Sequence, residues 1–525
     1  MQFDTIVVGA GSAGCVLANR LTEGGTHQVL LLEAGPRDTN RWIHVPLGYG
    51  KLFTDKTVNW SYESEPEEAL NGRRVFSPRG KVLGGSSSIN GLIYLRGQPE
   101  DFDGWNVPGW GWKELLPYFI RAEDQSRGKS AYHGVGGPLG VSDLERHELA
   151  DAFIASAEAN GIPRNDDFNG ASQLGTGYYQ ATSKNGRRSS TAAGYLRQAE
   201  KRPNLRVEVN AQATRVLFEG RRAVGVEFRQ GDRLRTARAN EVILAGGAFN
   251  SPQLLQLSGV GDGAHLQSLG IPVVHDLPGV GEALQDHLYV RNFYRANKAI
   301  TLNDDMANPL RQLWIGLQYV LARRGPLTIS AGHAAAIVKS RPDVPRPDTQ
   351  YYFINFSTAK RGGFLHPFSG FTCSVSQMQS DARGSVRIRS SDPLAPPAIR
   401  YNYLSSEKDR RWVVDALKQL RRITQTKPLA DYIIEEVQPG PAVQTDDEWL
   451  AYVRQYADTV FHPTSTCRMG TDAASVVDPQ LRVRGLQGLR VVDASVFPAV
   501  PSANTNASVI ALAEKAADVI RSDAG

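Results

Sequence analysis

The chain has 525 residues, of which 41% are hydrophobic and 22% charged, and its formal net charge is +5. This is the composition of a soluble globular protein with several domain-sized units, and it excludes a disordered chain. So small a basic excess argues against a nucleic-acid-binding protein. Three cysteines without C-x-x-C spacing exclude a disulfide framework and argue against structural zinc. We therefore expect no metal site and a cytoplasmic location.

The first 33 residues have the pattern of a βαβ unit. A β-branched run at 5–8 precedes the G-x-G-x-x-G segment at 9–14, and a second apolar strand at 28–32 ends at Glu33. Glycines at this spacing allow a tight turn, close approach of a pyrophosphate and close packing of helix on strand. We predict a dinucleotide site in which Glu33 accepts hydrogen bonds from ribose. The acid disfavours NADP but does not separate NAD from FAD.

Glycine makes up 51 of the 525 residues, and two further clusters lie at 80–91 and 246–261. Both favour close approach of backbone to a cofactor or a neighbouring element. The stretch 242–261 carries no charge, but its four glycines and proline predict buried loop and helix and argue against a membrane span. Near the C-terminus an apolar run at 488–492 ends at Asp493, an acid placed to face the cofactor crevice of an open α/β sheet.

The rest of the chain has a mixed α/β pattern. Strand-like runs lie at 205–209, 214–218, 223–228 and 241–245. Helical spacing of apolar residues is found at 148–160, 311–322, 407–424 and 508–521. The region 289–454 lacks a glycine-loop motif, which suits a separate substrate domain of sheet and helices.

His462 is the first candidate for proton transfer. It follows an apolar run at 459–461, where a lone histidine is more often a packed core or turn residue. The segment 501–507 joins the Asp493 strand to the final helix and can converge with His462 at the mouth of the crevice. Imidazole can take an alcohol proton at neutral pH, and an amide beside it can hold the developing alkoxide.

The chain resembles the glucose–methanol–choline (GMC) family of FAD-dependent oxidoreductases. The segment GKVLGGSSSIN at 80–90 is similar to the first family signature, and the segment from GAFNSP at 247–252 through SGVG at 258–261 is similar to the second. The βαβ unit, FHP at 461–463 and NTN at 504–506 match in the same order. The likeness spans essentially the whole chain and is nearest to bacterial choline, sorbose and other alcohol dehydrogenases.

The resemblance implies a mixed α/β (α+β) fold with two interleaved domains. A Rossmann-like FAD-binding domain would comprise 1–150, 203–288 and 455–525. A substrate-binding domain, built on an antiparallel sheet covered by helices, would comprise 151–202 and 289–454.

The resemblance also implies the site residues. His462 would be the catalytic histidine, and Asn506 would occupy the second His-or-Asn position of the family. Some relatives attach FAD covalently through a histidine where this chain has Ile89, so we expect noncovalent FAD. The cofactor-binding residues implied are Gly9, Gly11, Ser12, Ala13, Gly14, Glu33, Ala34, Val82, Ser86, Asn90, Gly91, Leu92, Ile93, Ala213, Asp493, Ala494, Thr505 and Ala507.

The implied reaction is oxidation of an alcohol to an aldehyde or ketone by hydride transfer to flavin N5. His462 takes the hydroxyl proton, and His462 and Asn506 hold the alkoxide. Electrons would pass to a quinone, another carrier or O₂. The sequence leaves peripheral membrane contact and the oligomeric state open.

Choline is a weaker candidate substrate than a neutral alcohol, a sugar of the sorbose type or an aromatic alcohol. Choline-type enzymes place a glutamate in the segment that corresponds to 327–338, where this chain has His333 and no acid. Aromatic residues within 351–356 could line a pocket, although most would pack in the core. A light-driven decarboxylase is disfavoured by His462. From outside this reaction class, a flavin redox sensor without turnover and an NAD-dependent dehydrogenase are rival hypotheses.

Overall fold

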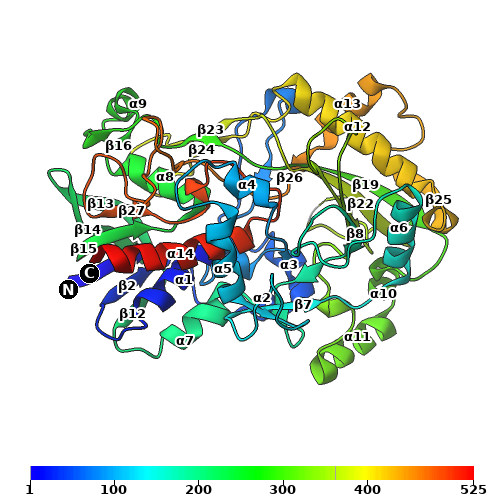
Figure 1. Ribbon diagram of the computed structural model, residues 1–525, viewed down its shortest axis with the longest axis horizontal. Coiled ribbons are helices and arrows are strands. Elements are labelled where there is room, and N and C mark those ends of the chain that lie inside the picture. Colours follow the sequence, from blue (N-terminus) through cyan, green and yellow to red (C-terminus); the bar gives the residue numbers. More distant parts are fainter. Residues whose placement is uncertain (1, 361, 525) are drawn as a thin grey trace.

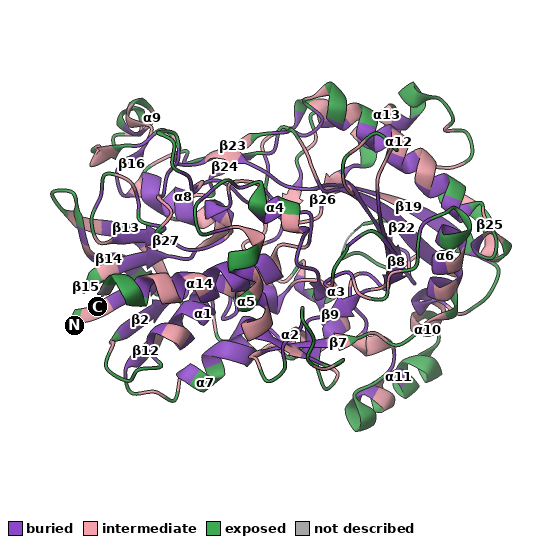
Figure 2. Ribbon diagram, in the orientation of Figure 1, coloured by how far each residue is buried: buried purple, intermediate pink, exposed green. Residues whose placement is uncertain are grey.

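Two sheets, one toward each end of the molecule, organise the chain (Figure 1). The computed structural model describes residues 2–360 and 362–524. Most strand residues of the second sheet are buried, as are about half of those in the first sheet, whereas many exposed residues lie on the outer helices and loops (Figure 2). No helix in these described ranges is long and apolar enough to span a membrane.

The first sheet has a parallel part and an antiparallel extension. Its strand order is β12-β2-β1-β15-β14-β13, with β27 also paired to β15. The pairs among β12, β2, β1, β15 and β27 are parallel, whereas β13–β14 and β14–β15 are antiparallel. The strands are β1 (Gln2–Val8), β2 (Val29–Leu32), β12 (Leu205–Glu208), β13 (Ala211–Glu219), β14 (Arg222–Gln230), β15 (Arg233–Leu244) and β27 (Leu489–Val491).

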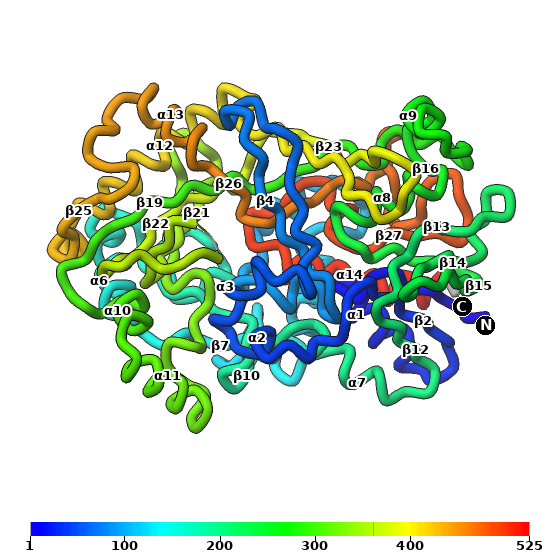
Figure 3. The backbone as a smooth tube through the Cα atoms, turned by 180° about the vertical axis from the view of Figure 1, so that it is seen from behind, coloured from blue at the N-terminus to red at the C-terminus, as the bar shows by residue number. Residues whose placement is uncertain are grey.

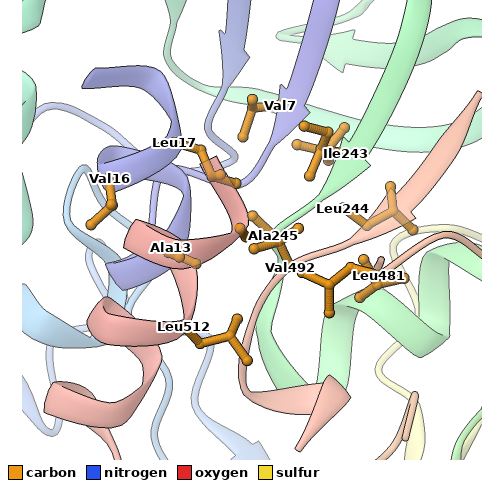
Figure 4. Packing of buried hydrophobic residues seen from close by; sticks show 14 of the residues in the cluster. Val7, Ala13, Val16, Leu17, Ile243, Leu244, Ala245, Leu481, Val492 and Leu512 are labelled. Atoms are coloured by element: carbon orange, nitrogen blue, oxygen red, sulfur yellow. The ribbon is translucent and has the colours of Figure 1, made fainter. Parts of the chain in front are cut away.

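Helices α1 (Ser12–Leu21) and α14 (Asn506–Ala524) pack together against this sheet, so the first and last helices are neighbours. Figure 4 shows the shared core, in which Val7 and Ile243 lie on adjacent strands and Leu17 comes from α1. Apolar side chains at helical spacing build this layer, because one stripe of each helix must be removed from water. The two chain ends lie close together at one end of the molecule (Figure 1).

The second sheet is antiparallel throughout and has the order β25-β19-β22-β21-β20-β8, with β26 paired to β19. Helices α6 (Glu148–Ala159), α12 (Glu407–Thr424) and α13 (Asp446–Tyr456) contact it. The strands are β8 (Gly175–Tyr178), β19 (Leu288–Ala296), β20 (Ala334–Val338), β21 (Thr349–Ile354), β22 (Gly370–Gln377), β25 (Ile433–Gln438) and β26 (Asp458–Thr459).

Shorter elements surround the two sheets. Small sheets are formed by β3 (Tyr62–Glu63) with β4 (Phe76–Ser77), by β5 (Ile93–Tyr94), β9 (Gln180–Ala181), β7 (Leu139–Asp143) and β6 (Glu123–Gln125), by β10 (Ser183–Lys184) with β11 (Arg187–Arg188), by β16 (Val260–Gly261) with β17 (His275–Asp276), and by β18 (Glu282–Leu284), β23 (Gly384–Arg387) and β24 (Ala398–Arg400). The other α-helices are α2 (Arg41–His44), α3 (Tyr49–Leu52), α4 (Pro99–Asp103), α5 (Trp112–Ala122), α7 (Arg197–Ala199), α8 (Gly247–Leu257), α9 (Gly263–Ser268), α10 (Leu302–Ala307) and α11 (Pro309–Ala322).

Residues 59–80, which we call the strap, contain β3 and β4 and cross the middle of the molecule between the two sheets (Figure 3). Arg73 donates to the carbonyls of Arg454 and Ala457, and the Glu67 carboxylate accepts the N–H groups of Tyr401 and Asn402. The strap therefore fastens a segment of the N-terminal region onto parts of the chain more than 300 residues away.

The mixed α/β class predicted from sequence is confirmed, and each predicted strand and helix corresponds to an element of the structure. The predicted strand at 214–218 is the centre of the longer β13, and the charge-free stretch 242–261 forms the end of β15 and then α8. Pro252 lies inside α8. The predicted domain boundaries remain a prediction.

A buried ionic cluster supports the small sheet that contains β6. His133 is placed with Nδ1 2.9 Å from Glu123 Oε1 and Nε2 2.9 Å from Asp167 Oδ2. Burial alone would lower the pKa of His133, but its bonds to Asp167 and Glu123 overcome this and raise it to about 9. Since this value exceeds the ordinary one, the protonated ring stabilises the fold fully at low pH, and the contribution is lost as pH rises through about 9.

We expect His133→Gln to lower the free energy of unfolding by about 2 kcal/mol at about pH 6, because a charge-assisted hydrogen bond contributes in this range. The deficit relative to the wild type should shrink as pH approaches 9. Thermal and urea unfolding at several pH values measures the deficit at about pH 6 and its change with pH. A deficit that stays constant with pH would contradict a protonated His133.

Candidate active site

A cavity of about 740 Å³ lies where the first sheet meets the second. One part of its wall comes from the first strand-turn-helix unit, the segment that follows β15 and the segment that follows β27. The other part comes from β19, β21 and the loops beside them. The cavity thus opens at the carboxyl edge of the parallel strands, where open α/β sheets bind their ligands.

Most of the predicted cofactor residues line this cavity. Those that do are Gly9, Gly11, Ser12, Ala13, Glu33, Ala34, Ser86, Asn90, Gly91, Leu92, Ile93, Ala213, Asp493, Ala494 and Thr505. Gly14, Val82 and Ala507 do not line it. Val82 and Ala507 are buried in core clusters, and Gly14 faces the strand behind it, where a Cβ would lie 1.8 Å from the Gly9 carbonyl oxygen.

The glycine turn before α1 forms a cradle for a negatively charged group. Gly11 is the N-cap of α1, and no side chain caps this helix end. A Cβ on Gly11 would meet no atom closer than 4.0 Å, so the backbone there faces open space in the cavity. An uncapped helix N-terminus with free N–H groups favours phosphate oxygens. The cradle therefore fits the pyrophosphate of FAD.

Glu33 directly follows β2, lines the cavity and is 5% exposed. Its carboxylate accepts the N–H groups of Ala10 and Gly35 at 2.9 and 2.8 Å. Burial raises the pKa of Glu33 to about 7, although both bonds oppose the change. Each carboxylate oxygen keeps a second lone pair, so the side chain can still accept from the hydroxyl groups of a ribose.

Asp493 follows β27 in the cavity wall and accepts hydrogen bonds from two residues of α8. Its Oδ2 accepts from the Gly247 N–H at 2.8 Å and from the Ser251 hydroxyl at 2.5 Å. Burial raises the pKa of Asp493. The acid predicted at the end of this strand thus reaches the cavity, and it also fixes the third glycine cluster to β27.

His462 lies in the cavity wall, on a loop held in a strained conformation. Phe461 before it has φ +73°, a value that a bulky residue adopts only when its surroundings impose it. Asp286, fully buried, accepts the His462 backbone N–H at 2.7 Å and also the hydroxyls of Thr459 and Tyr403. Arg79, from the strap, donates to the Phe461 carbonyl at 2.9 Å.

The amide next to His462 belongs to Asn504 and not to Asn506, the residue predicted for this place. Asn504 Nδ2 lies 3.1 Å from His462 Nε2, whereas Asn506 Oδ1 accepts from the Ser12 hydroxyl at 2.7 Å. The reason is that α14 begins at Asn506, which turns this side chain toward α1. Asn504 precedes the helix and faces the histidine. Both asparagines line the cavity.

The hydrogen bonds around His462 favour one tautomer of its ring. Gln350 donates to Asn504 Oδ1 at 3.3 Å, so the Asn504 NH₂ faces His462 Nε2, which accepts from it. The other ring nitrogen, Nδ1, then carries the proton and lies 3.0 Å from His287 Nδ1. Burial lowers the pKa of His287 to about 4, so this ring is neutral and can accept. These contacts favour the tautomer in which His462 Nε2 is the unprotonated, basic nitrogen.

Sequence reasoning did not identify Asn504 as the partner, nor Asp286 and His287. Asp286 and His287 lie about 175 positions from His462, and the pairing of β19 with β26 brings them together. A usable signal was present in the acid–histidine pair placed directly before an apolar strand.

The rest of the cavity wall is mostly apolar. The two carboxylates among the described lining residues, Glu33 and Asp493, belong to the cofactor part, and the other charged groups there are cationic or histidine. In β21, Tyr352 and Ile354 line the cavity, whereas Tyr351 and Phe353 pack in the core behind it. Further apolar lining residues include Leu47, Tyr49, Phe53, Tyr289, Leu302, Met306, Phe356, Phe364, Leu365, Val460 and Phe461.

Known proteins resemble the chain over nearly its whole length. Family models described as GMC oxidoreductase match residues 3–289 and 380–513. The chain is 45% identical to an alcohol dehydrogenase [acceptor] of Pseudomonas putida, over 99% of this chain and 96% of the relative. It is 43% identical to the mitochondrial choline dehydrogenase of Mus musculus, over 99% and 89%.

A solved FAD-dependent oxidoreductase from Chaetomium thermophilum superposes on the chain with a TM-score of 0.91 at 26% identity, covering 99% of both chains. Sequence relatives, structural neighbour and cavity agree. The chain therefore belongs to the GMC oxidoreductases, a family of FAD-dependent enzymes that act on the CH–OH group of their donors.

Proposed function

We propose that this protein binds FAD noncovalently in the cavity and oxidises a neutral, largely apolar alcohol to the aldehyde or ketone. The observation that carries the proposal is the pairing of His462 Nε2 with the Asn504 amide at 3.1 Å, at a wall shared by the cofactor residues and the apolar lining. When bound, FAD supplies the hydride acceptor that no protein side chain provides.

The residues of the first sheet would hold the cofactor. The α1 cradle at Gly11 would take the pyrophosphate and Glu33 the ribose, with Asn90 and Thr505 farther along the cavity. Ile89 also lines the cavity, and its alkyl side chain cannot form a covalent link to the cofactor. Acid precipitation of the holoprotein should therefore release all the yellow flavin into the supernatant. We further propose that the cofactor and substrate parts follow the domain boundaries predicted from sequence.

The chain's own residues perform the proton chemistry. The alcohol hydroxyl takes the place near His462 Nε2 and donates its proton to this basic nitrogen. The proton already on Nδ1 is held toward His287, so the ring keeps its orientation as it becomes charged. The Asn504 NH₂ is an adjacent donor that can stabilise the alkoxide oxygen without competing for the proton.

The charge of the cavity argues for a neutral substrate. Recognition of a quaternary ammonium favours an aromatic cage, commonly with a carboxylate nearby. Lys51 and Arg291 line the apolar part, and His333 is turned away, with Nε2 3.0 Å from the Glu145 carbonyl. Choline, suggested by the choline dehydrogenase relatives, is the second candidate, favoured by the aromatic lining residues.

A substrate panel tests the proposal. Purified holoprotein is mixed anaerobically with primary aliphatic alcohols, aryl alcohols, sorbose and choline, and loss of the visible flavin band is recorded. We expect apolar alcohols to bleach the flavin and choline to react more slowly. Failure of every alcohol to bleach it would support a redox sensor and overturn the enzyme assignment.

The electron acceptor is proposed to be a quinone or another carrier, with O₂ as the alternative. The alcohol dehydrogenase of Pseudomonas putida is named for an acceptor, and the proposal extends this to the present chain. Steady-state rates with O₂ and with a soluble quinone should differ, with the quinone faster. A faster reaction with O₂ would identify an oxidase.

A pair of asparagine variants tests which amide serves the reaction. Asn504→Ala removes the donor next to His462 Nε2, and we expect flavin reduction to slow by about 10²-fold. Asn506→Ala removes the acceptor for Ser12 and should mainly weaken FAD binding, with the reduction rate per bound flavin changed less than about fivefold. The reverse order of effects on the rate would restore Asn506 to the catalytic position.

A further inference from the structure

Helix α11 presents an apolar surface to solvent. Six large apolar side chains on it are exposed, up to 81% for Leu321 and 78% for Leu310, and Figure 2 shows the helix as mostly exposed. They are Leu310, Leu313, Trp314, Leu317, Val320 and Leu321. Apolar residues at such spacing normally face a core, because water penalises a contiguous apolar patch. Here the buried positions are Ile315 and Tyr319 instead.

The same helix is cationic. Segment 309–324 contains Arg311, Arg323 and Arg324 and no acidic residue. The acid that contacts this group is Asp305 on α10, 3.5 Å from Arg311. Tyr319 of α11 lies against α2, where its hydroxyl donates to the His44 carbonyl. Two more cations lie near this contact, because Arg41 of α2 and Lys51 of α3 are both placed over the ring of Trp42. The apolar surface is therefore accompanied by positive charge.

Helix α11 follows directly after α10, which forms part of the cavity mouth. Leu302 and Met306 of α10 line the cavity, and so does the loop that carries Phe364. This loop is bound to α10 through the Asn303 amide, which donates to the His366 carbonyl at 2.9 Å. The Phe364 side chain is 98% exposed. The apolar residues of α11 and Phe364 thus belong to elements on one side of the cavity entrance.

We propose that α11 and Phe364 form a docking surface for an anionic lipid bilayer, on which α11 lies in the plane of the interface. An exposed apolar stripe with arginines beside it has the chemistry of an interfacial helix, in which apolar side chains enter the acyl boundary and cations meet lipid phosphates. A second copy of the chain fits less well, because a symmetric contact would bring the two arginine groups together. On the bilayer the cavity mouth receives alcohols, and a quinone, that partition into lipid.

Vesicle binding of the purified holoprotein tests the surface without any turnover, so its outcome is separate from that of the proposed function. The protein is sedimented with phosphatidylcholine vesicles, with or without about one third phosphatidylglycerol. We expect binding to the anionic vesicles to be at least about tenfold stronger and to fall with added salt. The absence of binding to either vesicle overturns the proposal.

Surface variants assign the binding to α11. Leu313→Glu with Leu317→Glu should reduce vesicle binding by at least about tenfold, since two charges then enter the apolar interface. Leu234→Glu is the matched control, because Leu234 is 62% exposed like Leu313 but lies on the hairpin of β14 and β15. Activity with a soluble acceptor should be unchanged in the α11 variant, whose substituted residues do not line the cavity.

Two results would overturn the assignment. Equal loss of binding in the α11 variant and the Leu234→Glu control would place the lipid contact elsewhere. A wild-type dimer in analytical ultracentrifugation that the α11 variant converts to a monomer, without vesicle binding by the wild type, would make α11 a contact between copies of the chain.

Discussion

Replacement of His462 by alanine should leave a yellow holoprotein whose flavin is reduced by alcohol at least about 10³-fold more slowly. The contacts of His462 favour an unprotonated Nε2 at the cavity wall, and no other base in the described part of the chain lies at the same position beside Asn504. Loss of a positioned general base and of a hydrogen bond to the alkoxide has this scale of effect. Anaerobic stopped-flow measurement of the flavin band gives the rate directly.

The control for this variant is His265→Ala. His265 lies on α9, where Nε2 is 3.0 Å from the Ile388 carbonyl, and it does not line the cavity. It should reduce its flavin at the wild-type rate. A His462→Ala protein that reacts within about tenfold of wild type would remove His462 from the proton-transfer step.

Gly14→Ala should yield protein with little or no bound FAD. A Cβ at Gly14 would lie 1.8 Å from the Gly9 carbonyl oxygen, a backbone atom that cannot rotate away. Helix α1 must then move off β1, and the Gly11 cradle moves with it. We expect the flavin-to-protein absorbance ratio to fall by more than about tenfold and the melting temperature to fall by several degrees.

Gly24→Ala is the matched control, because a Cβ there would meet no atom within 4 Å. It should bind FAD like the wild type. A Gly14→Ala protein with full flavin content and an unchanged melting temperature would show that the helix need not pack this closely on the strand.

The cofactor part of the site was predictable from sequence because its signals are local. A strand, a glycine turn, a helix and a terminal acid are contiguous within 33 residues, and each requirement is met by backbone geometry at that place. Hence Gly9, Gly11 and Glu33 are in the cavity wall. Gly14 has the packing role that the motif assigns to its third glycine, which keeps it away from the cavity.

The catalytic part was only half predictable because its contacts are not local. Asn504 and Asn506 differ by two positions, and the residue at which α14 begins decides which one faces His462. Because asparagine occupies both positions, the local sequence does not distinguish them. The acid–histidine pair at 286–287 marks His287 as a candidate, but its contact with His462 depends on the pairing of β19 with β26, which neither segment alone predicts. The residue types therefore allowed a prediction of proton transfer at His462, but the side chains that contact His462 could be identified only from the tertiary structure.

The contact between α1 and α14 has a consequence for synthesis. Thr505 and Asn506 line the cofactor cavity and α14 packs on α1, although the ribosome makes Thr505, Asn506 and α14 long after α1. Until then the nascent protein carries β1 and α1 with an apolar face open to water and a half-built cavity. Tight flavin binding therefore has to follow translation of α14, and a ribosome stalled before residue 500 should present a colourless nascent chain.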